Sequence, residues 1–233
     1  MPTADRAHAC VGGLGAWDTR GVMAPLTLEG NVVRLEPLLP DHAPALSAAA
    51  TADRSSFRFT DVPADEAAMT RYIEVAIAAP DQYPFAIRRL ADGGLVGSTR
   101  FGSLQWWHGS ERPSVAEIGW TWLAASAQRT AVNTEAKLLL LTHAFEVWGV
   151  ERLQFKTDRL NEQSRAAIER LGAMFEGYLR HHVPAAERSG FRDSAMYSII
   201  PAEWPAVRSS LTARLSSARL ESHGTRRSRE NTT

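Results

Sequence analysis

Apolar and polar positions follow two different periods along residues 28–204, and their order predicts an α/β domain. Apolar residues recur at every third or fourth position in four predicted helices, at residues 40–50, 64–79, 134–148 and 161–171. Segments with strand character lie before, between and after them, at residues 31–38, 83–89, 95–106, 117–123, 152–157, 175–182 and 192–200. We therefore expect one mixed, mostly antiparallel sheet of about seven strands, flanked by helices.

Two of the predicted helices indicate which side should cover the sheet. In the helix at 64–79, the apolar face consists of Ala68, Tyr72, Val75 and Ala79. In the helix that ends near residue 148, it consists of Leu138, Leu141, Phe145 and Trp148. We expect both faces to belong to the core and the second one not to contact a cofactor.

A tight turn is predicted between the strands at 83–89 and 95–106. The four residues Ala91 to Gly94 contain Asp-Gly and Gly-Gly pairs, which favour hairpin turns. The two strands should therefore be antiparallel neighbours.

The polar segment 128–133 lies between the strand at 117–123 and the helix predicted from Thr134. The first N–H groups of a helix lack intrahelical partners, and the helix dipole adds partial positive charge there. Such a junction can bind a phosphate. Neither the three-glycine dinucleotide fingerprint nor the Gly-Lys-Ser/Thr of a P-loop is present. An ordinary start of a helix is the alternative interpretation.

Gln128 opens a segment that resembles the acetyl-coenzyme A loop of the GNAT acetyltransferase superfamily, with the usual pattern Gln/Arg-x-x-Gly-x-Gly/Ala. Ala131 and Asn133 replace the first glycine and the last small residue. Alanine loses access to the left-handed region at a cost of roughly 1 kcal/mol. Asparagine visits that region more readily and also caps helices well.

Downstream segments resemble the RimJ/RimL branch of this superfamily, in an order that spans roughly residues 28–204. An Asn161-x-x-Ser164 helix start precedes a helix that ends at Leu171-Gly172 and a strand at 175–180. The opening strand at 31–38 and the pair Asp41-His42 fit the same branch. The resemblance implies a GNAT-type fold and acetyl-CoA as co-substrate.

The resemblance also implies roles for particular residues. The pyrophosphate would lie on Gln128, Arg129, Thr130, Ala131, Val132, Asn133 and Thr134. Asn161 would contact the pantetheine arm, and Ser164 would help the leaving thiolate. Capping by Asn161 and a backbone hydrogen bond from Ser164 are the structural alternatives. Backbone N–H groups near Trp122 or Leu123 would stabilise the oxyanion.

Amine acetylation also needs a group that removes a proton, because an alkyl ammonium has a pKa near 10.4. Glu117 is the first candidate, since it lies on the strand that leads to the cofactor loop. By resemblance, this strand lines the acceptor channel. The alternative is that Glu117 pairs with a surface arginine or faces water.

Other aromatic and histidine residues carry weaker signals. Trp106, Trp107, Trp120 and Trp122 could stack on an acceptor, but tryptophans of strands are more often core. His181-His182 fits the edge of a sheet better than a base, and without further ligands at metal spacing it indicates no metal site.

Composition narrows the class of protein. The 233 residues carry 26 basic and 26 acidic side chains, which argues against a nucleic-acid partner. Cys10 is the only cysteine, so an internal disulfide is excluded and a reducing, cytoplasmic location is expected. No apolar run reaches 18 residues, so we expect a soluble protein and no membrane partner.

Three regions are predicted. Residues 1–22 form an extension that is either flexible or the result of an upstream start, 23–215 form the acetyltransferase domain, and 216–233 form a solvated, flexible tail.

The expected function is acetyl-CoA-dependent N-acetylation of a primary amine by direct transfer, at a protein N-terminus or a lysine. A small-molecule amine acetyltransferase and a non-catalytic acyl-CoA-binding or regulatory module are the alternatives. The acceptor should be selected by the loops at 54–61 and 105–113. A homodimer is left open.

Overall fold

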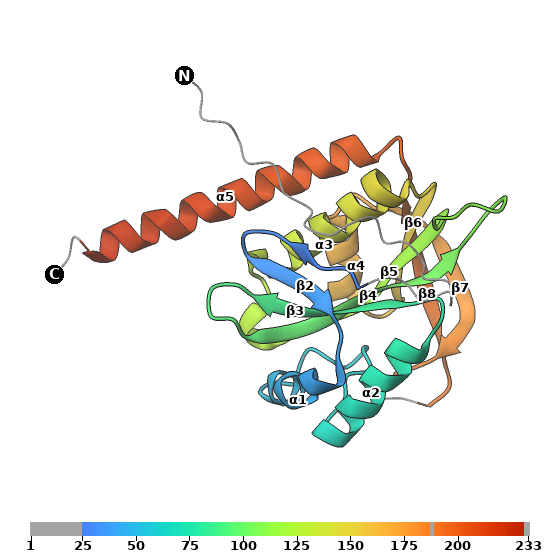
Figure 1. Ribbon diagram of the computed structural model, residues 1–233, viewed down its shortest axis with the longest axis horizontal. Coiled ribbons are helices and arrows are strands. Elements are labelled where there is room, and N and C mark those ends of the chain that lie inside the picture. Colours follow the sequence, from blue (N-terminus) through green and yellow to red (C-terminus); the bar gives the residue numbers. More distant parts are fainter. Residues whose placement is uncertain (1–24, 187–188, 231–233) are drawn as a thin grey trace.

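The protein folds around one eight-stranded sheet (Figure 1). The computed structural model describes residues 25–186 and 189–230, with side chains as far as residue 218. The strands are β1 (Leu28–Glu29), β2 (Val33–Pro37), β3 (Tyr83–Arg89), β4 (Leu95–Gln105), β5 (Val115–Leu123), β6 (Arg152–Asp158), β7 (Met174–Pro184) and β8 (Phe191–Ile199). The helices are η1 (Pro40–His42), α1 (Ala43–Thr51), α2 (Glu66–Ala78), η2 (Ala125–Ala127), α3 (Ala131–Thr142), η3 (His143–Trp148), α4 (Glu162–Glu169) and α5 (Trp204–Glu230).

The order of strands in the sheet is β1-β2-β3-β4-β5-β6-β8-β7. All neighbours are antiparallel except β5 and β6, which pair in parallel from Val115 with Arg152 to Glu117 with Gln154. Both strands continue beyond this point without further pairing to each other, so they diverge after Glu117. The change from paired to diverging strands is the feature that positions the candidate site.

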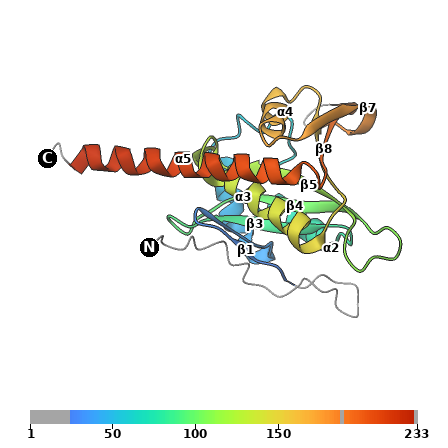
Figure 2. The same ribbon diagram turned by 90° about the horizontal axis from the view of Figure 1, so that it is seen from above.

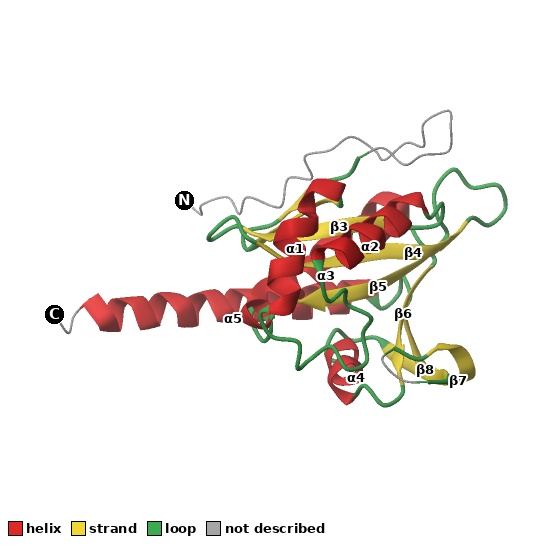
Figure 3. Cartoon of the chain, turned by 90° about the horizontal axis from the view of Figure 1, so that it is seen from below, coloured by secondary structure: helices red, strands yellow, loops and turns green. Residues whose placement is uncertain are grey.

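Helices cover both faces of the sheet. One apolar cluster joins α1 and α2 to one face, with Leu46, Met69 and Ile73 fully buried. A larger cluster on the other face includes residues of α3 and α5, and these two helices pack on each other. Figure 1 shows α1 and α2 on one side of the strands and α3 and α5 on the other, and Figure 3 shows α1 and α2 from their own side.

The helix α5 is long and passes beyond the sheet (Figures 1 and 2). Leu211 and Leu215 are buried, and they belong to the larger cluster. The predicted boundary at residue 216 falls inside this helix, which continues to Glu230. The predicted extension at 1–22 lies outside the described residues.

The expected α/β architecture is confirmed, with eight strands instead of about seven. The additional strand is the two-residue β1, which is too short to show a period. The hairpin at Ala91 to Gly94 is also confirmed, because β3 and β4 are antiparallel neighbours.

The predicted face of the helix at 64–79 is wrong. Asp65 accepts a hydrogen bond from the backbone N–H of Ala68, and the helix that starts there buries Met69, Ile73 and Ala76. Val75 is instead 69% exposed. Because apolar residues occur all around α2, the sequence spacing alone could not select the buried side.

Candidate active site

Glu117 lies where β5 and β6 diverge, and its side chain is almost completely buried, with 1% of the residue exposed. The Nζ atom of Lys156 on β6 is 2.8 Å from its Oε2 atom. The Ser103 hydroxyl donates to the same oxygen at 2.9 Å. Both structural alternatives for Glu117 are therefore wrong, because it neither pairs with a surface arginine nor faces water. The arrangement is a buried, charge-assisted contact within reach of the diverging strand ends.

Trp120 covers this ion pair because β5 is irregular at that point. The register between β4 and β5 shifts between Ser98 and Arg100, and Trp120 has a φ of 49°. The Lys156 Nζ lies 5.6 Å from the centre of the Trp120 ring. A Cβ atom at Gly102 would lie 2.4 Å from this ring, so only glycine leaves room for the indole. Trp120 therefore does not only pack in the core, because its ring also lies over Lys156.

His182 on β7 belongs to the same charged group, although the sequence placed it only at a sheet edge. Burial lowers the pKa of its imidazole, the charges of Lys156 and Arg192 lower it further, and Glu117 opposes them. Its Nδ1 atom is buried and has no hydrogen-bond partner among the described residues. Because the charge of Glu117 acts on this imidazole, His182 is a second candidate base. No local pattern around His182 could have identified it, because the register of β7 with β8 shifts between Leu179 and Val183.

The predicted cofactor loop is a strand-turn-helix junction, as expected, but its details differ. Helix α3 begins at Ala131, three residues before the predicted start, and Thr130 is the cap. The Thr130 hydroxyl accepts from the Val132 N–H at 3.2 Å and donates to the Ala127 carbonyl at 2.7 Å. Arg129, with a φ of 57°, holds the left-handed position. Ala131 and Asn133 are helical, so the expected strain at Ala131 and the expected cap at Asn133 are both wrong.

Gln128 connects this loop to its surroundings. Its Nε2 atom donates to the Leu123 carbonyl at 2.9 Å and to the Ser56 hydroxyl at 2.7 Å. Ser56 belongs to the loop between α1 and α2, one of the two predicted acceptor loops. The side chain of Gln128 thus connects the end of β5 to the loop between α1 and α2.

Helix α4, like α3, begins with a cap whose side-chain oxygen accepts a hydrogen bond from a backbone N–H of the first turn. The Asn161 Oδ1 atom accepts from the Ser164 N–H at 3.0 Å, so Asn161 is a cap. No hydrogen bond between described residues uses the Ser164 hydroxyl, which removes the expected alternative of a backbone bond. Both residues are partly exposed.

Trp122 and Leu123 lie at the end of β5. Trp122 is 3% exposed and meets Phe57 edge to face, with ring centres 6.0 Å apart. The Ala124 N–H donates to the Val96 carbonyl on β4. Since successive N–H groups of a strand point to opposite sides, the Leu123 N–H is directed toward the side from which β6 diverges. Leu123 is therefore the better of the two oxyanion candidates. Trp106 and Trp107 are 37% and 42% exposed in the loop after β4.

Lys137 is buried on the α3 side of the sheet. Its Nζ atom donates to the Thr121 hydroxyl at 2.6 Å and to the Thr99 hydroxyl at 3.4 Å. Burial lowers the pKa of this amine to about 7. Lys137 thus contacts β5 from the α3 side, at the residue that follows Trp120. The sequence predicts Lys137 to be helical but indicates no role for its amine.

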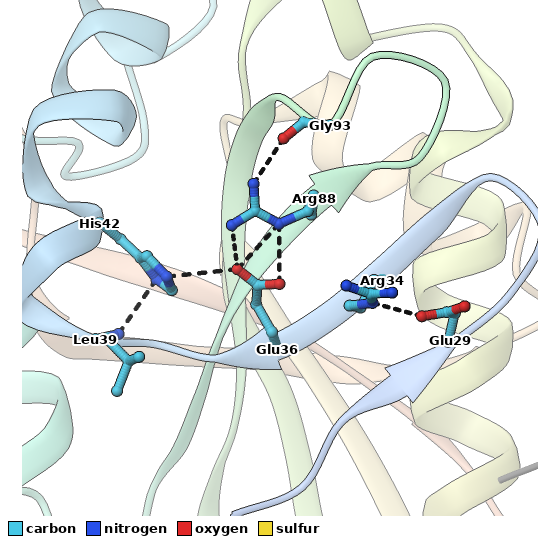
Figure 4. A network of polar contacts seen from close by, with 7 residues as sticks. All are labelled: Glu29, Arg34, Glu36, Leu39, His42, Arg88 and Gly93. Carbon is cyan, nitrogen blue, oxygen red and sulfur yellow. Dashed lines mark hydrogen bonds and ion pairs between the residues drawn. The ribbon is translucent and has the colours of Figure 1, made fainter. Parts of the chain in front are cut away.

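A separate polar network ties η1 to the sheet on the α1 side (Figure 4). Glu36 accepts from the Arg88 Nε and Nη2 atoms at 3.0 and 2.5 Å, and the His42 Nε2 is 3.4 Å from Glu36 Oε1. The His42 Nδ1 accepts from the Leu39 N–H at 3.3 Å. The hydrogen bond from Arg88 lowers the pKa of Glu36, and burial lowers that of His42. The pair Asp41-His42 thus has a structural explanation, because His42 joins η1 to β2.

Two further properties concern the described part of the chain. Its side chains contain no group of three or more His, Cys, Asp or Glu residues with the arrangement of a metal site. None of its helices combines the length and the apolar character that crossing a bilayer requires.

Solved structures of acetyltransferases have the same fold as this protein. A structure of a GCN5-related N-acetyltransferase from Brucella melitensis superposes with a TM-score of 0.73 and 31% identity, covering 81% of this chain and 85% of the other. Mycobacterium smegmatis RimJ, in complex with CoA-disulfide, shares the fold with a TM-score of 0.65 and 24% identity, over 82% of this chain and 93% of RimJ.

Sequence comparison leads to the same family. A Bacillus subtilis (strain 168) protein named "Putative ribosomal N-acetyltransferase YdaF" is 31% identical over 115 residues, which are 49% of this chain. The chain spans 58% of the length of that curated relative. The family described as acetyltransferase (GNAT) domain matches residues 33–174. Because this match covers more than half of the chain and includes β5, the cofactor loop and α4, the chain belongs to the GNAT acetyltransferase family.

Proposed function

We propose that this protein transfers the acetyl group of acetyl-CoA directly to a primary amine, at the N-terminus or a lysine of a protein. The observation that carries the proposal is the buried carboxylate of Glu117 at the point where β5 and β6 diverge. The relative named "Putative ribosomal N-acetyltransferase YdaF" and the RimJ/RimL resemblance of the sequence favour a protein acceptor over a small amine.

Different residues of the site would bind different parts of acetyl-CoA. The pyrophosphate of acetyl-CoA would bind the main-chain N–H groups at the start of α3, where Arg129, Ala131 and Asn133 lie. Asn161 would contact the pantetheine arm. The thioester carbonyl would meet the Leu123 N–H, because preorganised backbone donors stabilise an oxyanion strongly where water is excluded.

Proton transfer would then complete the step. Glu117 would accept a proton from the ammonium form of the acceptor, directly or through a water, and the free amine would attack the thioester carbon. The carbon–sulfur bond would break, and the Ser164 hydroxyl would donate its proton to the departing thiolate. The second proton of the attacking nitrogen would pass to Ser164, which restores the hydroxyl and leaves a neutral amide. His182 is a second candidate for the base, since the lowered pKa of its imidazole keeps it neutral near pH 7.

The test is an assay of thiol release from acetyl-CoA with a panel of amino-terminal peptides, lysine peptides and polyamines. We expect thiol release that depends on a peptide amine and is strongly reduced in Glu117→Gln. Turnover of polyamines alone would favour the small-molecule alternative. Binding of coenzyme A without amine-dependent release would favour the non-catalytic module.

A further inference from the structure

Arg100 is a buried cation on the same face of the sheet as Glu117. It pairs with Gly119 across β4 and β5, and Gly102 pairs with Glu117, so these four residues share one face. Only 3% of Arg100 is exposed. Its position on this face makes it a neighbour of the candidate active site and not part of the core beneath α3.

Aromatic rings contact the Arg100 guanidinium, but no acid does. Its Cζ atom lies 4.5 Å from the ring centre of Tyr72 on α2 and 5.2 Å from that of Trp120. Its Nη1 atom donates to the Gln82 side chain at 2.7 Å. The Nε atom is buried without a partner, and no carboxylate of the described residues forms an ion pair with Arg100. Gln82 is therefore the one hydrogen-bond partner that this guanidinium, with five N–H donors, has among the described residues.

Neighbouring cations on this face are paired. Lys156 contacts Glu117, and Arg88 contacts Glu36. A buried charge is costly unless it is paired and hydrogen-bonded, and flanking rings offset only part of that cost. Arg100 thus retains the capacity to bind an anion, and its planar donors suit a carboxylate.

We propose that Arg100 selects acceptors that carry a carboxylate close to the amine to be acetylated. Trp120 sets the spacing, because Arg100 and Lys156 both lie within 6 Å of its ring, and Lys156 marks the position of Glu117. The two distances, 5.2 Å for the Arg100 Cζ and 5.6 Å for the Lys156 Nζ, place these atoms no more than about 11 Å apart. An extended peptide advances about 3.3–3.6 Å per residue, so an acidic side chain in the second or third position would reach Arg100.

This inference rests on the proposed acetyl transfer and specifies that the preferred acceptor carries a negative charge near its amine. The carboxylate could come from an acidic side chain of a peptide or from a small amine that carries its own acid group. The two sources share the same chemistry at Arg100, and the acceptors used in the experiment separate them.

The experiment compares kcat/KM for acceptor pairs that differ by one charge. Peptides with Asp or Asn in the second and third positions form one arm, and small amines with a carboxylate or the corresponding amide form the other. Wild-type protein should prefer the acidic member by about 10- to 100-fold, the range expected for a charged hydrogen-bonded contact. Arg100→Met should remove the preference and retain turnover of the amide member. Arg88→Met, which removes a paired cation from the same face, should retain the preference.

The outcomes separate the two proposals. Equal rates for acidic and amide peptides in the wild type would overturn the role of Arg100 and leave peptide acetylation intact. A preference for acidic small amines with no peptide turnover would keep Arg100 and reject the protein acceptor. A preference that persists in Arg100→Met, with coenzyme A binding as a check of folding, would also overturn the inference. If that variant does not fold, the wild-type comparison still decides.

Discussion

The Nζ atom of Lys156 lies 2.8 Å from the Oε2 atom of Glu117, and this ion pair joins the last paired residue of β5 to β6, two residues beyond the last paired residue of β6. The contact has two consequences. It keeps a carboxylate in a site that is almost closed to water, and it holds together two strands that would otherwise diverge freely. Removing one partner of a buried ion pair strongly destabilises the folded protein, because the other charge stays buried without a partner.

Glu117→Gln should reduce kcat by on the order of 100-fold or more, because the amide has the same shape but cannot accept the proton. The rate should recover partly as pH rises and the free amine becomes more abundant. Steady-state kinetics across pH would measure both effects. Since the substitution leaves Lys156 without its acid, the melting temperature must be recorded on the same sample.

Lys156→Met provides the matched control for this prediction. It breaks the same ion pair and retains the carboxylate, so activity should persist in the folded protein even though the melting temperature falls. A Glu117→Gln variant with the wild-type rate and pH profile would assign Glu117 to structure, and His182→Gln would then test the second candidate base.

Ala131→Pro should weaken coenzyme A binding without weakening the fold. Ala131 is the first residue of α3, where proline is tolerated, and Thr130 before it is already extended with ψ near 180°. The change removes one N–H group from the proposed phosphate site. The Kd for coenzyme A should rise by about tenfold, measured by calorimetric titration.

Thr130→Ala is the complementary variant for the cofactor loop. It removes the cap of α3 and should lower stability by about 1 kcal/mol while leaving the N–H groups in place. If both variants bind coenzyme A as the wild type does, the phosphates lie elsewhere.

Ser164→Ala should lower kcat and leave the affinity for acetyl-CoA nearly unchanged, because a proton donated to the thiolate matters mainly in the transition state. The hydroxyl has no hydrogen bond to the described residues, so the melting temperature should hardly change. Asn161→Ala is the contrasting change, since it removes a cap and should lower the melting temperature. Normal turnover by Ser164→Ala would end its catalytic assignment.

The parts of the fold that local signals encode could be predicted from the sequence. Asn161 caps α4, Gly149 ends η3 with a φ of 70°, and the glycines after Asp92 form the β3–β4 turn. Each of these depends on residues within a few positions of one another. The strand-turn-helix at Gln128 was identifiable for the same reason.

The contacts within the site depend on pairing between distant segments, which no local pattern reports. Trp120 covers Lys156 and Arg100 only because β5 is irregular against β4. The charge of Glu117 acts on His182, which lies where the register of β7 with β8 shifts. Periodicity predicts both strands but not these shifts, so it could identify neither Lys156 as the partner of Glu117 nor Arg100 as a neighbour of Trp120.

Lys137 should make the stability of the protein depend on pH in the neutral to alkaline range. Burial lowers the pKa of its amine to about 7 in the folded state, from 10.5 when exposed. Between these values the unfolded chain binds more protons than the folded one, so the free energy of unfolding rises with pH, by up to about 1.4 kcal/mol per pH unit. Below pH 7 both states are protonated, and the folded state carries the full cost of the buried charge.

Replacing Lys137 by a neutral residue isolates this effect. Lys137→Met and Lys137→Gln lack the charge, and glutamine can still donate a hydrogen bond to Thr121. Relative to either variant, the wild type should gain roughly 2 kcal/mol between pH 7.5 and 9.5 in urea unfolding. The range stays below pH 10 because burial raises the pKa of Tyr83, so stability should fall again where that phenol ionises in the unfolded chain. A constant difference between the wild type and both variants over this range would show that the amine of Lys137 titrates alike in the folded and unfolded states.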